Sequence, residues 1–392
     1  MYMSLKKDPG DAYNRIIAGL LYFIILFTQL HRGQLLAVIT TCVLLYVSFL
    51  YSLMRRRVLG LSALICCGLW LFMILYLVRP DYLGNIETKI EIGWLGIGVI
   101  MLLIASMNSG YISVSPSVLY DSALLGAILI VVSMITQSTI GGLLAPPYAG
   151  TRYVGGFDGP NEMAHFYVLA LSLMLGEHLL RRPVRFVWAK ASVFAAVIIS
   201  AWSRSALGAL LVMYVLCFGW AFFQRRGSRR LRVAVIFLLF STLVAHVYMQ
   251  AVQPQLGVVR RAASGRSPLL ETTATIVKRK PICGYGLGSY WFQGNVRNTT
   301  PHSEYFLFAA SGGMLGVMFL VGFYIYWLNT ALKKRMYPET ITLLVFYALE
   351  AFFNNLVRGR VSLFFWVLIL LVSTSLDSGG TEGSIGFLGR RK

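Results

Sequence analysis

Arginines and one histidine in the second half of the chain have the chemistry to bind an anion and to accept a proton. Arg204 lies in a short polar turn between two apolar runs, and Arg266 lies in a long polar segment. A guanidinium group binds a phosphate or diphosphate through two parallel hydrogen bonds. His302 opens the next apolar run, and neutral imidazole is the form that a general base needs near pH 7.

Further arginines, Arg152, Arg260 and Arg261, are predicted on the same side of the membrane. The acids predicted there are too few near them to pair with every arginine; they are Asp81, Glu87, Glu91, Asp158, Glu162, Glu271 and Glu304. An arginine near the bilayer interior costs about 2.5–3.5 kcal/mol, so Arg204 needs a partner. An anionic ligand is one interpretation, and a side chain that extends from a span end to the membrane surface is the other.

A glycine cluster, Gly284, Gly286 and Gly288, follows the arginines. Its backbone N–H groups could form a nest that donates to the same anion, although a plain turn is the simpler interpretation.

The position of His302 favours its neutral form, since the positive end of a helix dipole and nearby arginines both oppose protonation. On an unbroken helix, Gly313 lies about three turns below His302 on nearly the same face, and Gly316 about 40° away. Gly312 and Gly316 form a small-xxx-small pair. We expect this seam to admit another helix and so to fix the direction of His302. Alternatively, His302 is an ordinary interfacial residue.

Other polar residues give weaker signals. Asn161 with His165, and Glu350 with Arg358, could line a common cavity. We find no spacing typical of a metal site, no Walker-type loop and no paired carboxylates of the glycosidase type. The five cysteines form no disulfide or metal pattern. We therefore expect neither a metal nor a cofactor.

The composition predicts an all-α, polytopic membrane protein. The 392 residues are 57% hydrophobic and 13% charged, whereas soluble proteins have about 25% charged residues. The polar residues Met1–Gly10 give no sign of a cleavable signal peptide. The net charge of +20 comes mostly from residues that flank apolar runs, so it indicates membrane orientation rather than nucleic-acid binding.

About twelve apolar runs are predicted to span the membrane. They are 14–30, 35–54, 58–78, 92–107, 122–140, 163–180, 186–202, 206–223, 231–252, 303–328, 340–354 and 361–375. We expect a single membrane domain over 1–392. The loop 253–302, between the ninth and tenth spans, should carry part of the site, and the tail 377–392 should be mobile and cytoplasmic.

Basic residues predict the orientation. With the N-terminus inside, cytoplasmic segments hold 21 of the 35 Lys and Arg residues, and seven of the others lie in 253–302. Both termini are therefore predicted to be cytoplasmic, and the long loop to face outward.

A short helix is predicted inside this loop. Ser267 and Pro268 fit its N-cap and N1 positions, and Pro281 would end it. Leu270, Ala274 and Val277 would share its apolar face.

These motifs resemble the O-antigen ligase and O-antigen polymerase superfamily of bacterial envelope proteins, roughly from Arg152 to Gly316. The ligase pattern of arginine followed four residues later by leucine is matched by Arg266 and Leu270. The pattern of histidine, a small polar residue, nine residues and Gly-x-x-Gly is matched from His302 to Gly316. The Arg-x10-Gly pairs of some polymerases are absent, since Met163 and Val277 stand at the expected glycine positions after Arg152 and Arg266. That difference favours the ligase.

The resemblance implies a metal-independent, inverting glycosyltransferase of the bacterial inner membrane. Its donor would be a glycan on undecaprenyl diphosphate, and its acceptor a lipid A–core sugar hydroxyl on the periplasmic side. Arg204, Arg266 and Arg152 would bind the diphosphate, and His302 would be the catalytic base. Arg261, Asn161 and Tyr305 would support the site. Membrane lipids are the other expected partners.

Two other functions remain open. The first is an O-antigen polymerase, whose acceptor is a second lipid-linked glycan. The second is a transporter of anionic lipids or solutes, which should show broken helices near the membrane midplane in two related halves.

Overall fold

The computed structural model describes most of the chain as helices. The described residues are 9–54, 61–79, 81, 83, 86–108, 115, 117–145, 153–157, 159–180, 183–201, 203, 206, 208, 266–288, 303–333, 347 and 361–374. The helices are α1 (Pro9–Thr28), α2 (Gln34–Met54), α3 (Leu61–Leu77), α4 (Ile86–Met107), α5 (Ser117–Thr136), α6 (Pro160–Leu180), α7 (Val187–Ser200), α11 (Arg266–Arg279), α13 (Glu304–Lys333) and α15 (Val361–Thr374). No strand occurs within these ranges, so the all-α class is confirmed there.

Hydropathy located these helices well. Every described helix except α11 overlaps a predicted span. The helices α2, α4, α5 and α13 contain segments long and apolar enough to cross a membrane by themselves. Predicted spans 206–223, 231–252 and 340–354 lie almost wholly outside the described residues, so the total of about twelve stays a prediction.

The core of the bundle is built on α6 and α15. Met163–Glu177 in α6 and Ser362–Leu371 in α15 are buried without interruption. Such all-round burial is expected of a helix enclosed by other helices. In α15, Trp366 packs edge-on against Trp70, with ring centroids 5.0 Å apart. Gly98 of α4 allows this packing, because a Cβ there would lie 2.4 Å from the Trp366 ring.

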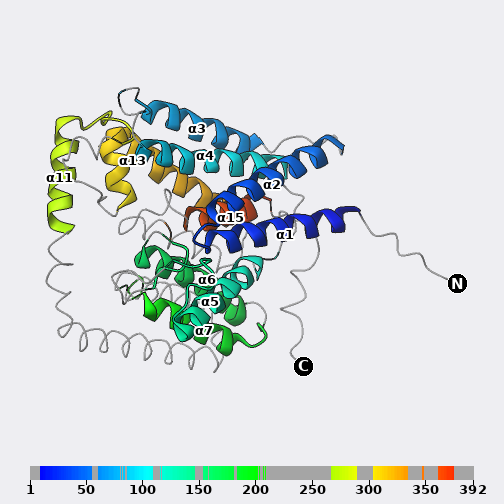
Figure 1. The fold of residues 1–392 in the computed structure, drawn as a ribbon. Coiled ribbons are helices and arrows are strands. Elements are labelled where there is room, and N and C mark those ends of the chain that lie inside the picture. The colour runs from blue at the N-terminus through cyan, green and yellow to red at the C-terminus, as the bar shows by residue number, and fades with distance from the viewer. Residues whose placement is uncertain are drawn as a thin grey trace, which may run out of the picture.

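Several turns that were predicted to face outward meet one another. The His31 N–H donates to the Leu143 carbonyl at 2.8 Å, which joins the turn after α1 to the turn after α5. The Leu287 N–H donates to the Leu77 carbonyl at 2.7 Å, which joins the predicted loop to the end of α3. We call the end of the bundle formed by these turns the outward end. It lies at the left of Figure 1, opposite the Pro9 end of α1.

The ion pair between Lys190 and Asp121, with a nitrogen–oxygen distance of 2.8 Å, lies near the starts of α7 and α5. These residues belong to α7 and α5, at the ends of those helices that were predicted to be cytoplasmic. The contacts therefore agree with the predicted alternation of the helices.

Candidate functional site

The predicted site residues are only partly described. Arg152, Arg204, Arg261 and His302 lie outside the described residues, so their proposed roles stay predictions. Arg266 is the first residue of α11. Asn161 lies in the first turn of α6, and Tyr305 is the second residue of α13.

The helix predicted inside the polar loop is confirmed as α11. It begins at Arg266, one residue before the predicted N-cap, and ends at Arg279, two residues before Pro281. The predicted apolar face is wrong in detail, because Ala274 is exposed whereas Thr273 and Ile276 are buried. Ile276 packs with Leu307 and Ala310 of α13.

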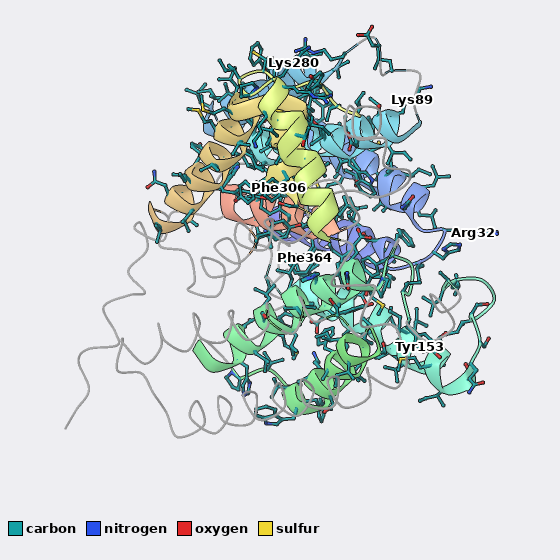
Figure 2. The ribbon with its side chains drawn as sticks, turned by 90° about the vertical axis from the view of Figure 1, so that its left-hand side faces the viewer. Arg32, Lys89, Tyr153, Lys280, Phe306 and Phe364 are labelled. Atoms are coloured by element: carbon teal, nitrogen blue, oxygen red, sulfur yellow. The ribbon has the colours of Figure 1, made fainter. Side chains whose placement is uncertain are left out.

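The helix α11 lies across the outward end instead of running along the bundle. Figure 1 shows it at the left edge, steeply inclined to α3 and α4. Figure 2 looks onto the outward end, with α11 in front, Lys280 at its upper end and Phe306 beside it. The helix that begins with Arg266 therefore lies over the start of α13, which directly follows Ser303 and the predicted base His302.

The helix α13 is broken at Gly313, which overturns the unbroken helix on which the predicted glycine seam was built. Gly313 has φ 62° and ψ −152°, a conformation available almost only to glycine. The helical geometry used to place Gly313 and Gly316 below His302 therefore fails at this residue. A Cβ on Gly313 would lie 2.4 Å from the carbonyl carbon of Ile282, so a loop makes the close approach there. At Gly312 a Cβ would lie 2.7 Å from the Leu77 side chain, so α3 does approach closely at that glycine.

The loop after α11 satisfies the backbone groups that the break exposes. The N–H groups of Tyr285 and Gly286 donate to the carbonyls of Ala310 and Ser311, at 3.0 and 2.7 Å. In the other direction, two N–H groups that follow the break donate to loop carbonyls: Met314 to Pro281 at 2.7 Å and Leu315 to Ile282 at 3.3 Å. Because buried backbone groups need partners, this exchange stabilises the break and fixes the loop on α13.

The glycine cluster serves the same packing and does not form the predicted anion nest. The Gly286 N–H is used by Ser311, as above, and the Gly284 N–H donates to the Lys280 carbonyl at 3.1 Å. The Gly288 N–H donates to the Glu91 carboxylate at 3.2 Å. All three donors thus have partners within the protein. The simpler interpretation, a turn, is the correct one.

The break folds the first part of α13 back along its second part. Tyr305 and Tyr324 have ring centroids 6.3 Å apart. On an unbroken helix these two residues would be about 28 Å apart along the axis. The segment 304–312 is almost entirely buried, whereas exposed side chains recur along the second part at Met314, Met318, Val321 and Ile325. The first part therefore lies inside the protein, and the second presents an exposed apolar stripe.

This fold-back buries a carboxylate among phenol groups. Glu304 is 0% exposed, and it lies within electrostatic range of the hydroxyl groups of Tyr305, Tyr324 and Tyr347. Glu162, in the first turn of α6, also lies within electrostatic range of the Tyr347 hydroxyl group. We call these five residues the acidic cluster. An ionisable group buried in a membrane protein commonly marks a functional site.

Sequence reasoning missed the burial of Glu304. This residue appeared there only as one outward acid that could pair with an arginine. Its place two residues after His302, at the start of a long apolar run, was the available signal. The burial of Glu304 depends on the break at Gly313, and the continuous apolar run gives no sign of that break.

The first turn of α6, which carries Asn161 and Glu162, is held by a buried polar contact below it. The Tyr167 hydroxyl donates to Oε1 of Gln29 at 2.8 Å, and Nε2 of Gln29 donates to the carbonyls of Ile25 and Ser122. Gln29 is fully buried, so it joins the outward end of α1 to the start of α5 and to α6. Gly156 packs against the backbone of Gln29 in the turn after α1, since a Cβ at Gly156 would lie 2.3 Å from the Gln29 carbonyl oxygen.

One comparison with known proteins bears on this region. Residues 189–321 match the family described as O-antigen ligase. The matched residues include Arg204, Arg266, His302, all of α11 and α13 through its break. No curated protein matches the chain.

Proposed function

We propose that this membrane protein, whose match over residues 189–321 supports membership of the O-antigen ligase and polymerase superfamily, is an O-antigen ligase. The substrates would be a glycan on undecaprenyl diphosphate and a sugar hydroxyl of lipid A–core. The match is the observation that carries the proposal, because it includes each of the three residues to which we assign the main chemical roles.

In the proposed reaction, the acceptor hydroxyl oxygen attacks the anomeric carbon of the sugar joined to the diphosphate. The bond between that carbon and the diphosphate oxygen breaks, and undecaprenyl diphosphate leaves with the electron pair. His302 takes the hydroxyl proton. Arg204 and Arg266, with Arg152, stabilise the negative charge that develops on the leaving group. Attack on the face opposite the leaving group would invert the configuration of the anomeric carbon.

The acidic cluster suits this chemistry. When His302 accepts the proton it becomes a cation, and a nearby carboxylate stabilises a cationic imidazole. Glu304, two residues further along the chain, is the buried carboxylate closest in sequence. We assign it the role of a positioning residue for His302. Arg261, Asn161 and Tyr305 keep supporting roles in this proposal.

The break in α13 does not favour the transporter alternative. In transporters, the ends of a broken helix bind the substrate or its coupling ion. Here the carbonyls of Ala310 and Ser311 and the N–H groups of Met314 and Leu315 bond to the loop 281–286. The backbone groups on the two sides of the break are therefore hydrogen-bonded within the protein and are not left to bind a substrate or ion.

The outward end is proposed to face the periplasm, with both termini cytoplasmic in the bacterial inner membrane. This orientation rests on the distribution of basic residues, and the lipid-linked substrates implied by the family would meet the site in the outer leaflet.

Incubation of the purified protein with lipid-linked glycan, with and without lipid A–core, tests the proposed function. A ligase gives a glycan-bearing lipid A–core product on a gel, and only when that acceptor is present. A product that lengthens on undecaprenyl diphosphate without lipid A–core would instead identify a polymerase. If neither product forms, although a control enzyme uses the same lipid-linked glycan, the proposal of glycan transfer is rejected.

A further inference from the structure

Four basic side chains gather where α3, α11 and the loop after α11 meet at the outward end. They are Arg79, Lys278, Arg279 and Lys280, which we call the basic rim. Lys278, Arg279 and Lys280 are exposed, and Arg79 is half-buried. No acid occurs among residues 76–79 or 273–288. Of the acids nearby, Asp81 follows Arg79 by two residues, Glu91 accepts the Gly288 N–H, and Glu271 lies in α11 about two turns before Lys278.

Two cations of the rim each lie over a tyrosine ring. The Lys280 ammonium lies 4.5 Å from the centroid of the Tyr285 ring, and the Arg79 guanidinium lies 5.8 Å from that of Tyr76. The Tyr76 hydroxyl donates to the Cys283 carbonyl at 3.1 Å, so the two tyrosines belong to the same surface. Tyrosines and basic residues together are typical of the boundary between a membrane and water.

The length of α13 places the rim at this boundary. After the break, 314–333 comprises 20 residues, about 30 Å of helix, which equals the hydrocarbon thickness of a bilayer. Its first residues, Met314 and Leu315, bond to the carbonyls of Pro281 and Ile282. Lys280 therefore lies level with the outward end of a membrane span.

Exposed apolar side chains lie directly beside the cations. Ile282 is 57% exposed, and Met314 and Met318, one turn apart on the stripe of α13, are 57% and 61% exposed. Exposed apolar side chains would not stabilise a free, hydrated phosphate. A lipid would place its phosphate at the cations and its acyl chains along Ile282 and the stripe.

We propose that the basic rim binds the phosphate of an anionic lipid that lies in the leaflet beside α3 and α13. Guanidinium and ammonium groups donate to the phosphate oxygens, and the tyrosines hold two of these groups in place. This site is separate from the acidic cluster and does not depend on the proposed glycan transfer.

Native mass spectrometry of the purified protein, titrated with phosphatidylglycerol or phosphatidylcholine, tests this proposal. We expect the protein to retain phosphatidylglycerol at lower concentration than phosphatidylcholine. In Arg79→Gln/Lys280→Gln, the phosphatidylglycerol concentration for half-occupancy should rise about 25-fold, because each lost cation should raise it about fivefold. The matched control is Arg32→Gln/Lys89→Gln, which removes two exposed cations elsewhere on the same end (Figure 2) and should leave that concentration unchanged.

Three results would overturn the lipid site. One is equal retention of the two lipids by the unmodified protein, and another is an equal loss in the two double variants. The third is displacement of phosphatidylglycerol by inorganic phosphate at matched concentration, which would identify a site for free anions. If Arg79→Gln/Lys280→Gln unfolds, Lys278→Gln/Arg279→Gln takes its place, because both side chains are exposed, with the same expectation.

Discussion

Replacing Gly313 with alanine tests whether the break in α13 organises the candidate site. The change adds one methyl group at φ 62° and ψ −152°. Holding a non-glycine residue in this region costs about 1–3 kcal/mol. The new Cβ would also lie 2.4 Å from both the carbonyl carbon and the oxygen of Ile282, and these backbone atoms cannot rotate away. Overpacking adds about 1–3 kcal/mol.

The expected cost is therefore about 2–6 kcal/mol, a large part of the stability of a typical folded protein. The chain can reduce it only by moving the loop away, which breaks the four hydrogen bonds between 281–286 and α13. We expect a clearly lower unfolding temperature in detergent, as measured by tryptophan fluorescence. Protease sensitivity between α11 and α13 should increase as well.

Gly322→Ala in the same helix is the matched control. No atom lies within 4 Å of a Cβ at Gly322, so the added methyl group meets open space. Alanine also favours a helix over glycine by about 1 kcal/mol. An unfolding temperature for Gly313→Ala equal to that of Gly322→Ala would refute the fold-back of α13.

Three further predictions concern the donor site, the core and the orientation. Arg266→Lys keeps the charge but loses the two parallel hydrogen bonds, so transfer activity should fall strongly while the protein still inserts; near-normal turnover would mean that Arg266 does not bind the diphosphate. Gln29→Leu leaves the buried Tyr167 hydroxyl without its acceptor and should lower the free energy of unfolding by about 1–3 kcal/mol, and adding Tyr167→Phe should restore part of this loss in a double-mutant cycle. Asn298→Cys should react with a membrane-impermeant thiol reagent in intact spheroplasts, against a background without exposed cysteines, and labelling only after lysis would reverse the proposed orientation.

Apolar run lengths were sufficient to predict most described helices, because each run is close to the length that crosses a bilayer. The signals of Pro268 and Pro281 likewise predicted α11 in a polar segment. These are local properties, so they can be recognised from neighbouring residues alone.

The break at Gly313 could not be predicted in this way. Its backbone groups are satisfied by Pro281, Ile282, Tyr285 and Gly286, about 30 residues earlier in the chain, and a hydropathy pattern carries no sign of that pairing. The same long-range contacts occupy the Gly286 donor of the glycine cluster, and the fold-back that they stabilise buries Glu304. Motif reasoning thus predicted the region of the proposed site, whereas the acidic cluster emerged only from the folded chain.

The initial rate of glycan transfer by His302→Gln, measured between pH 6 and pH 9 beside the unmodified protein, tests the central claim most directly. Glutamine keeps a hydrogen bond but cannot accept a proton. General-base catalysis is worth roughly 10²–10⁴-fold, about 3–5 kcal/mol of the barrier. We predict a loss of this size, nearly unchanged donor binding and the disappearance of the pH dependence that His302 causes. Full turnover at pH 7 with an unchanged pH profile would contradict proton transfer to His302.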